Sequence, residues 1–299
     1  MTILCVLVTF FWGLGYPVLK MANRFWAIDS SNVGMTILFA GMRFFVAGLL
    51  LIAFASLRGK KIAIPRKSSV GKIALLGLLQ TFLEYSFFYV GMINTTSAKS
   101  SVLKQLCVFL TVLLSPVFFK QDKITLKKII GCLIGFAGIV VMNLDGNKLN
   151  VSTGDFLIIV SSVVTAFGYI VSKKIGQVED AFCSTGYQQL FGGFLLMAVG
   201  FLMGGRIGAP ASENTFKAVL SFAYLACESA FCFSMWFYLL QHYETARVTV
   251  YKFLTPIFGV VLSALFLAEE RAEMFKITNI IALVLVCAGI LIVNKHKKA

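Results

Sequence analysis

The sequence predicts an all-α integral membrane protein whose ten transmembrane helices form two inverted five-helix repeats. Three observations carry this prediction. Of the 299 residues, 59% are hydrophobic and only 13% are charged, whereas soluble domains are about half apolar and a quarter charged. Mean hydropathy is +0.87. Apolar runs follow one another along the whole chain, and the pattern of the first half recurs in the second. A soluble globular class is therefore excluded.

Ten segments reach the ~20 apolar residues that a helical span needs. They are expected to be helical because an open sheet would leave backbone groups unpaired in lipid. The predicted spans are residues 3–21, 33–57, 71–93, 96–119, 127–144, 154–173, 182–204, 216–241, 245–268 and 274–294. An even number of spans places the two termini on the same side of the membrane.

Basic residues gather in the loops on one side of this arrangement. Clusters lie between spans two and three, around the join of spans four and five, after span six and at the C-terminus. Short loops rich in Lys and Arg remain in the cytoplasm. We therefore expect an integral protein of the cytoplasmic (inner) membrane with both termini cytoplasmic. The net charge of +14 reflects this loop bias, and no basic patch interleaved with aromatics indicates nucleic-acid binding.

The two halves of the chain match each other. At an offset of 148 residues, Lys104 in span four falls on Lys252 in span nine. Spans five and ten end in the similar runs GIVVMN and GILIVN. We expect residues 1–148 and 149–299 to be two five-helix repeats that together form one transport unit. Because five is odd, the second repeat crosses the membrane in the opposite sense. This architecture is typical of secondary transporters with a site near the bilayer midplane.

Four stretches of the chain carry family motifs. They are TFFWGLGYPVLK (9–20), MRFFVAGLLL (42–51), NTTSAKSSVL (94–103) and LTPIFGVVLSALFLAEE (254–270). Together they resemble the EamA-type members of the drug/metabolite transporter superfamily over nearly the whole chain. The sequence departs from the family at Ala268, where glycine is usual, and at Gln121, where glutamate is frequent. The resemblance implies a secondary transporter, frequently an exporter of amino acids and related metabolites, without an ATP-binding domain.

Lys104 and Lys252 are the first candidates for a substrate site. Each lies about 10 Å into its span at 1.5 Å per residue, and a charged side chain at such depth is costly unless it has a role. We interpret them as two cations that face a central cavity and bind a carboxylate or phosphate. The organic-phosphate carriers related to the family also place basic residues on spans four and nine. Snorkelling of each lysine toward the headgroups is the alternative.

Polar and aromatic residues on neighbouring spans complete the candidate site. Glu84 and Glu228 are carboxylates inside spans three and eight, and each is a candidate for carrying a coupling proton or for a structural ion pair. Gln80 matches Glu228 in the repeat and lies four residues from Glu84, on the same helical face. The aromatic candidates for lining a cavity are Trp12, Tyr16, Trp236 and Tyr251. Packing or an interfacial belt is the alternative for all four.

The expected function is secondary transport of a small polar metabolite, an amino acid or related carboxylate, by alternating access and in the direction of efflux. An exchanger of a phosphorylated or other anionic metabolite is the alternative. Rivals of other classes are a non-transporting scaffold and an intramembrane enzyme, but no catalytic or metal-ligand cluster emerges from the sequence. We therefore expect no enzyme activity and no cofactor. Expected partners are the substrate, the lipid bilayer and protons as a candidate coupling ion, and the oligomeric state is left open.

Overall fold

The computed structural model describes residues 1–29, 31–59, 63–95, 97–142, 152–210, 212–267 and 276–295. Helices are the regular secondary structure of these residues, and none of them lies in a strand. Eight described helical segments are long and apolar enough to cross a membrane: Thr2–Phe25, Val33–Gly59, Lys67–Ile93, Ser100–Phe118, Thr153–Ile175, Ser212–His242, Thr245–Phe266 and Ile277–Asn294. The all-helical membrane class predicted from the sequence is confirmed.

Several of these segments consist of more than one helix. The first half contains α1 (Thr2–Phe25), α2 (Val33–Gly59), α3 (Lys67–Gly77), the π-helix η1 (Leu78–Leu83), α4 (Glu84–Ile93), α5 (Ser97–Lys104), α6 (Leu106–Phe118) and α7 (Leu126–Met142). The second half contains α8 (Thr153–Ile175), α9 (Ala181–Leu202), the short 3-10 helix η2 (Ser212–Asn214), α10 (Thr215–His242), α11 (Thr245–Thr249), the 3-10 helix η3 (Val250–Phe253), α12 (Leu254–Phe266) and α14 (Ile277–Asn294). The segments that carry Glu84, Lys104 and Lys252 are therefore discontinuous, whereas α1 and α10 are unbroken.

Two further helices occupy the places of the remaining predicted spans. α7 has 17 residues, slightly fewer than the ~20 that a typical span needs. α9 has 22 residues but carries Gln188 and Gln189, which lower its hydropathy. Both glutamine side chains are fully buried, and the oxygen of Gln188 accepts a hydrogen bond from the Thr81 hydroxyl on η1. The polar content of α9 is therefore directed into the protein.

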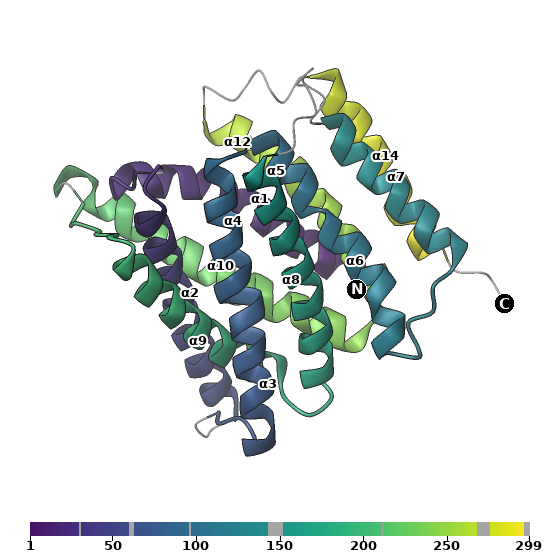
Figure 1. Cartoon of the computed structure of the whole chain (residues 1–299), viewed down its shortest axis with the longest axis horizontal. Coiled ribbons are helices and arrows are strands. Elements are labelled where there is room, and N and C mark those ends of the chain that lie inside the picture. Colours follow the sequence, from purple (N-terminus) through teal and green to yellow (C-terminus); the bar gives the residue numbers. More distant parts are fainter. Residues whose placement is uncertain are drawn as a thin grey trace.

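Glycines bring α2 and α9 into close contact (Figure 1). Gly41 and Gly193 lie at the middle of this contact. A Cβ atom on Gly41 would lie 2.6 Å from the backbone nitrogen of Met197, and one on Gly193 would lie 2.9 Å from the carbonyl oxygen of Gly41. Small residues allow two helix backbones in a membrane to approach closely enough for van der Waals packing. Gly34 with Gly200 and Gly48 with Gly186 repeat the arrangement toward the two ends.

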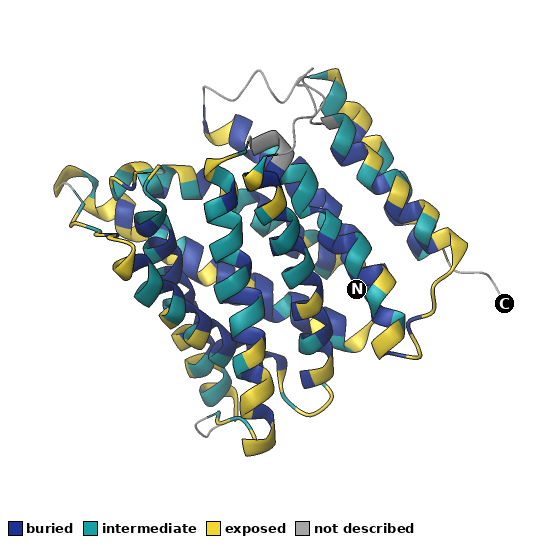
Figure 2. Ribbon diagram, viewed as in Figure 1, coloured by how far each residue is buried: buried dark blue, intermediate teal, exposed yellow. Residues whose placement is uncertain are grey.

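The other helices pack in a regular pattern. α7 lies along α14 at the edge of the molecule, where Gly131 contacts Gly289 (Figure 1). In the centre, α1 packs on α10 and α12, while α8 packs on α4 and α6. Buried residues concentrate where these helices face one another, as Figure 2 shows. The two central helices α1 and α8 therefore hold the interior together.

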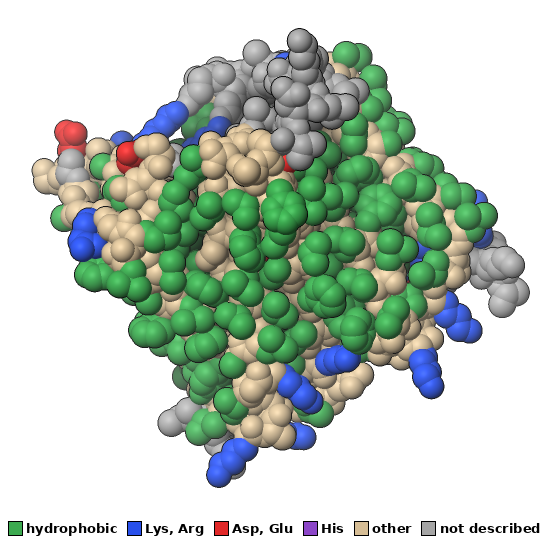
Figure 3. Space-filling model, in the orientation of Figure 1, with side chains coloured by type: hydrophobic (Ala, Val, Ile, Leu, Met, Phe, Trp, Pro, Cys, Tyr) green, Lys and Arg blue, Asp and Glu red, His purple; other side chains and the backbone are tan. Residues whose placement is uncertain are grey.

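The outer surface matches a lipid environment. Large apolar side chains such as Ile3, Leu57, Leu202 and Phe216 are about four-fifths exposed. Figure 3 shows hydrophobic side chains across the middle of one face and Lys and Arg side chains gathered along its lower edge, where α3 begins. Exposed apolar surface on this scale is unfavourable in water and favourable in a bilayer. The protein is an integral membrane protein.

Candidate functional site

Breaks in three helical segments position three of the four charged candidates, Glu84, Lys104 and Lys252. Gln80 lies in the π-helix η1, and Glu84 follows it directly. Lys104 is the last residue of α5, before the interruption at Gln105. Lys252 lies in the 3-10 helix η3 between α11 and α12. Altered helical hydrogen bonding is frequent at functional sites, and transporters build their binding sites from discontinuous helices.

Lys104 is held in an ion pair. Its ammonium lies 2.9 Å from Oε1 of Glu84 and donates hydrogen bonds to the hydroxyls of Ser161 at 2.7 Å and Thr165 at 3.0 Å. Glu84 also accepts a hydrogen bond from the side-chain amide of Gln80. The Glu84 carboxylate is only 5% exposed, and the Lys104 side chain is 16% exposed. The charge of Lys104 is therefore already balanced inside the protein.

Lys252 has a different environment. Its ammonium donates a hydrogen bond to the hydroxyl of Tyr169 and lies 4.8 Å from the ring centre of Trp12, 5.0 Å from that of Tyr169 and 6.0 Å from that of Trp236. Aromatic faces attract a cation through the ring quadrupole, most strongly for Trp. Within the described residues, no carboxylate forms an ion pair with Lys252. Unlike Lys104, it is therefore available to pair with a negatively charged ligand.

The two lysines face the same interior region. Lys104 binds Thr165 and Lys252 binds Tyr169, and these two residues lie four apart on one face of α8. Cys107, three residues after Lys104, is fully buried on α6. The charges of Lys104 and Glu84 also act on Lys252. Such interactions inside a protein are strong only between groups that lie near one another. The structure therefore brings together the lysines that the sequence repeat pairs.

Glu228 belongs to a second polar group. Its carboxylate is near Gly15 on α1, where a Cβ atom would lie 3.5 Å from Oε1, and it accepts a 3.4 Å hydrogen bond from the hydroxyl of Ser229. The buried guanidinium of Arg43 interacts electrostatically with it. Gly15 lies three residues from Trp12, so this group is about one helical turn from Lys252 along α1. Glu228 and Lys252 are therefore separate parts of the interior.

The aromatic candidates do not all meet. Trp236 is fully buried and packs on Trp12 with ring centres 5.2 Å apart, beside Lys252. Tyr16 is 48% exposed and lies against Gly259. The hydroxyl of Tyr251 lies 3.1 Å from that of Thr2, at the start of α1. Consecutive residues of a 3-10 helix point about a third of a turn apart, so Tyr251 is directed away from the neighbouring Lys252 and its aromatic partners.

Three further residues of this site lie on α8, and two of them, Ser161 and Thr165, were not among the sequence candidates. Tyr169 binds the ammonium of Lys252, and Ser161 and Thr165 bind that of Lys104. Tyr169 has a signal in the repeat, because Gly168-Tyr169 matches Gly15-Tyr16 at an offset of 153 residues. Ser161 and Thr165 are four residues apart and therefore share one helical face. Hydroxyl pairs are too common in membrane helices to identify a site without the packing of α8 against α4 and α6.

The formal charges of the two groups leave one positive charge. Lys104 and Glu84 balance each other, as do Arg43 and Glu228, while Lys252 has no partner of opposite charge among the described residues. The described residues contain no group of three or more His, Cys, Asp or Glu side chains that could hold a metal ion. The arrangement can therefore receive one negative charge beside three aromatic rings.

Comparison with known sequences connects this arrangement to a family. The sequence pattern of the EamA-like transporter family matches residues 1–144 and again residues 152–295. The chain belongs to the EamA-like transporter family. The resemblance found in the motifs is thereby confirmed. Membership and the apolar helices together make this protein a membrane transporter.

Individual relatives agree with this assignment. The chain is 29% identical over 254 residues to the inner membrane transporter YedA of Escherichia coli, covering 84% of this chain and 78% of YedA. It is 26% identical over 293 residues to the transporter YvbV of Bacillus subtilis, covering 96% and 89% of the two chains. A solved crystal structure shares the fold of this EamA-family chain, with a TM-score of 0.76 at 17% identity and coverage of 97% and 96%.

Proposed function

We propose that this EamA-family protein is a ten-helix inverted-repeat secondary transporter. It moves a small polar metabolite, an amino acid or related carboxylate, across the cytoplasmic membrane by alternating access and in the direction of efflux. The observation that carries the proposal is the ammonium of Lys252, which is surrounded by Trp12, Tyr169 and Trp236 and has no carboxylate partner in the described part of the chain. A cation in this setting is a natural ligand for a substrate carboxylate.

The packing of the helices supports two repeats with the predicted bounds 1–148 and 149–299. Exchange of the two halves would map α2 onto α9 and α7 onto α14, and these pairs are in mutual contact. The same exchange maps the contacts of α1 with α10 and α12 onto the contacts of α8 with α4 and α6. An inverted repeat of this kind provides two alternative gates of similar energy around one site. The five-helix repeats thus supply a physical basis for alternating access.

The charges favour a carboxylate over a phosphate ester. A phosphate monoester carries close to two negative charges at neutral pH, whereas the interior offers one positive charge beyond its balanced pairs. Lys104 becomes available to a second negative charge only if it leaves Glu84, which costs several kcal/mol in a buried environment. A singly charged carboxylate needs no such rearrangement. We therefore place amino acids and carboxylates ahead of phosphorylated metabolites.

A carboxylate near the lysines supports a zwitterionic substrate. Glu84, held by Gln80 and Lys104, lies close enough to Lys252 to act on its charge. A substrate ammonium can bind Glu84 while its carboxylate binds Lys252. Glu228 on α10 lies beside Gly15 of α1, about one turn from Trp12, and is the second acceptor for an amine or for a coupling proton. This division of roles suits an amino acid whose charges are moved together.

The proposal is tested by ligand stabilisation of the purified protein in detergent. The compounds are amino acids, carboxylates, phosphate esters, nucleosides and amines, and the variants are Lys252→Leu and the control Lys174→Leu. We expect an amino acid or carboxylate to raise the unfolding temperature of the wild type and of Lys174→Leu, because a ligand at 100 times its Kd stabilises by about 2.7 kcal/mol. The same compound should not change the unfolding temperature of Lys252→Leu. This variant should fold, because a leucine side chain packs well among aromatic rings.

Stabilisation of all three proteins by the same neutral or cationic compound would overturn the substrate assignment. A binder must also be transported. We expect proteoliposomes that contain the wild type, but not Lys252→Leu, to exchange the radiolabelled binder with an unlabelled internal pool. Binding without any exchange would identify a scaffold or sensor instead of a transporter.

A further inference from the structure

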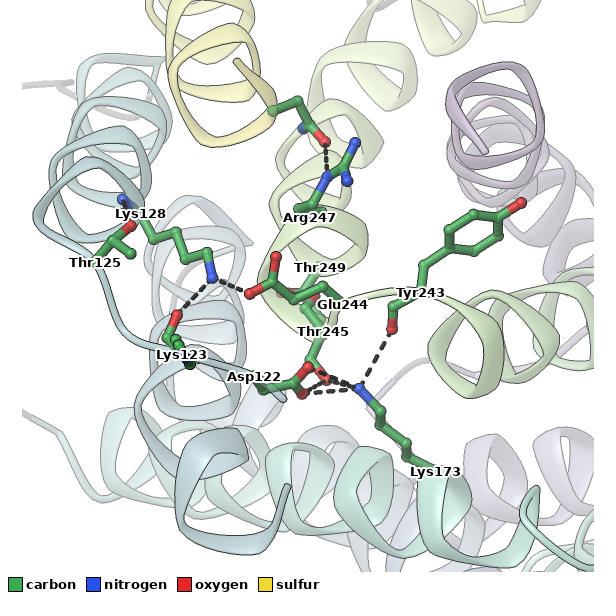
Figure 4. Close-up of polar contacts among 11 residues, drawn as sticks. Asp122, Lys123, Thr125, Lys128, Lys173, Tyr243, Glu244, Thr245, Arg247 and Thr249 are labelled. Atoms are coloured by element: carbon green, nitrogen blue, oxygen red, sulfur yellow. Dashed lines mark hydrogen bonds and ion pairs between the residues drawn. The ribbon is translucent and has the colours of Figure 1, made fainter. Parts of the chain in front are cut away.

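A buried ion pair joins three segments at one end of the helical bundle. The ammonium of Lys173, in the last turn of α8, lies 2.8 Å and 3.0 Å from the two carboxylate oxygens of Asp122, which follows α6. It also donates a 2.9 Å hydrogen bond to the hydroxyl of Thr245, the first residue of α11, and that hydroxyl donates to Asp122. Figure 4 shows these contacts. We call Asp122, Lys173 and Thr245 the latch.

The latch is shielded from solvent. Asp122, Lys173 and Thr245 are 2%, 5% and 1% exposed. Beside it, Lys128 at the start of α7 pairs with Glu244, the residue before Thr245 (Figure 4). Asp122 and Lys128 belong to the first half of the chain, whereas Lys173, Glu244 and Thr245 belong to the second. These ion pairs therefore fasten the two halves to each other.

Two elements connect the latch to Lys252. On α8, Tyr169 and Lys173 are four residues apart and share one face; Tyr169 contacts Lys252 and Lys173 contacts Thr245. Thr245 and Lys252 belong to the continuous run of α11 and η3, seven residues or about 10 Å apart. α8 therefore contacts this run at two points: Tyr169 with Lys252 at the candidate site, and Lys173 with Thr245 at the latch. A ligand that binds Lys252 in place of the Tyr169 hydroxyl removes one of these two contacts.

A cavity of about 440 Å³ adjoins the latch. Asp122, Lys123, Lys128, Lys173, Tyr243 and Glu244 contribute to its lining. Water in this space can hydrate the charges of Asp122 and Lys173 once they separate, which lowers the cost of opening. In the proposed topology the cavity faces the cytoplasm, because the loops after α6 and α8 carry basic clusters.

We propose that the latch is the cytoplasmic gate of this transporter and that it is closed in this structure. This inference rests on the proposed function, since a gate has a purpose only in transport. With the pair formed, Asp122, Lys173 and Thr245 close the space between α6, α8 and α11 below Lys252. Separation of the pair opens a route from the cavity to the site. A buried ion pair suits a gate because it is stable when its geometry is intact and costly when only half formed.

The gate is tested without any substrate, through the accessibility of Cys107. The other six cysteines are replaced by alanine, and a membrane-impermeant thiol reagent is applied to inverted membrane vesicles and to intact cells. The variants are Asp122→Asn and Lys173→Met, with Lys174→Met as a control. Lys174 is the exposed neighbour of Lys173, and its ammonium lies over the ring of Phe118. Both latch variants leave one buried polar partner uncompensated.

We expect modification of Cys107 in inverted vesicles to be at least about tenfold faster in Asp122→Asn and Lys173→Met than in the wild type. The reason is that loss of one partner of a buried ion pair shifts the equilibrium from the closed to the open state by more than tenfold. The control should match the wild type, and the exchanged pair Asp122→Lys with Lys173→Asp should restore slow modification. Equal rates in all variants, or faster modification from both faces of the membrane, would overturn the gate. Because no substrate enters the assay, this result is independent of the ligand screen.

Discussion

At the scale of single residues, the repeat explains why its two lysines differ. At the offset of 148 residues, Phe88 corresponds to Trp236, and each aromatic ring lies beside its lysine, at 5.5 Å for Lys104 and 6.0 Å for Lys252. Glu84, however, corresponds to Cys232. Lys104 therefore has a carboxylate beside it, whereas the corresponding position beside Lys252 is occupied by a cysteine. The two copies of the repeat have kept the cations and changed their partners.

The Glu84–Lys104 pair makes a prediction about stability. We expect Glu84→Gln to destabilise the protein by about 3 kcal/mol, because it leaves a buried ammonium without its counter-charge. The double variant Glu84→Gln with Lys104→Met should recover most of the loss, since the uncompensated charge is then removed. The measurement is the unfolding temperature in detergent without ligand, and equal values for the single and double variants would contradict the pairing.

At the scale of elements, the contact of α2 with α9 depends on the absence of side chains. Glycines face the partner backbone at three levels, with Gly41 and Gly193 in the middle. Membrane helices gain no hydrophobic driving force from mutual contact, so their association depends on van der Waals packing. Any added Cβ atom must push the two helices apart along their length. Arg43 and the Gly77–Gln188 contact lie beside this helix pair, so its spacing also affects the interior polar groups.

Two glycine-to-alanine substitutions should have opposite effects. Gly193→Ala places a methyl group 2.9 Å from the carbonyl oxygen of Gly41 and should destabilise the protein by about 1–3 kcal/mol through overpacking. Gly71→Ala, on the exposed side of α3 with no atom within 4 Å of the new methyl, should stabilise it by up to about 1 kcal/mol through helix propensity. The comparison uses unfolding temperatures in detergent. A stable Gly193→Ala variant would show that α2 and α9 do not need this close approach.

At the scale of the whole molecule, charge and hydropathy divide the surface into a lipid-facing band and two polar ends. The described loops after α6 and α8 and the start of α3 lie at one end, and Figure 3 shows Lys and Arg below the apolar middle. The polar latch lies at the same end as the basic loop after α8. The interior charges lie between the two ends. This division supports a topology with both termini in the cytoplasm.

The topology predicts which side of the membrane each loop occupies, including the loops around α7 and α9. In intact cells that produce a cysteine-free protein, we expect an impermeant thiol reagent to modify single cysteines at Thr153 and Gly208 but not at Lys123 and Gln177. Disrupted cells, in which all four should react, are the control. Equal labelling on both sides of α7 or of α9 would show that this helix does not cross, and the ten-span prediction would then be wrong.

The sequence by itself determined the membrane class, the family, the approximate positions of the helical segments and the pairing of Lys104 with Lys252. These properties follow from the local hydropathy of each ~20-residue window and from residue identities at a fixed offset, neither of which needs knowledge of packing. The described helices fall at the predicted positions, and the family pattern matches both halves. The crossing of α7 and α9, the orientation and the substrate class remain proposals.

Only the tertiary structure decided which polar groups meet. In the structure, Glu84 pairs with Lys104, aromatic rings surround Lys252, and Lys173 contacts Asp122 and Thr245. It also directed Tyr251 toward Thr2, away from the other candidates. Such contacts join segments tens to hundreds of residues apart, and the direction of a side chain depends on local breaks such as η1 and η3. A hydropathy pattern fixes the depth of a residue in the membrane, whereas its rotation and neighbours are set by helix packing.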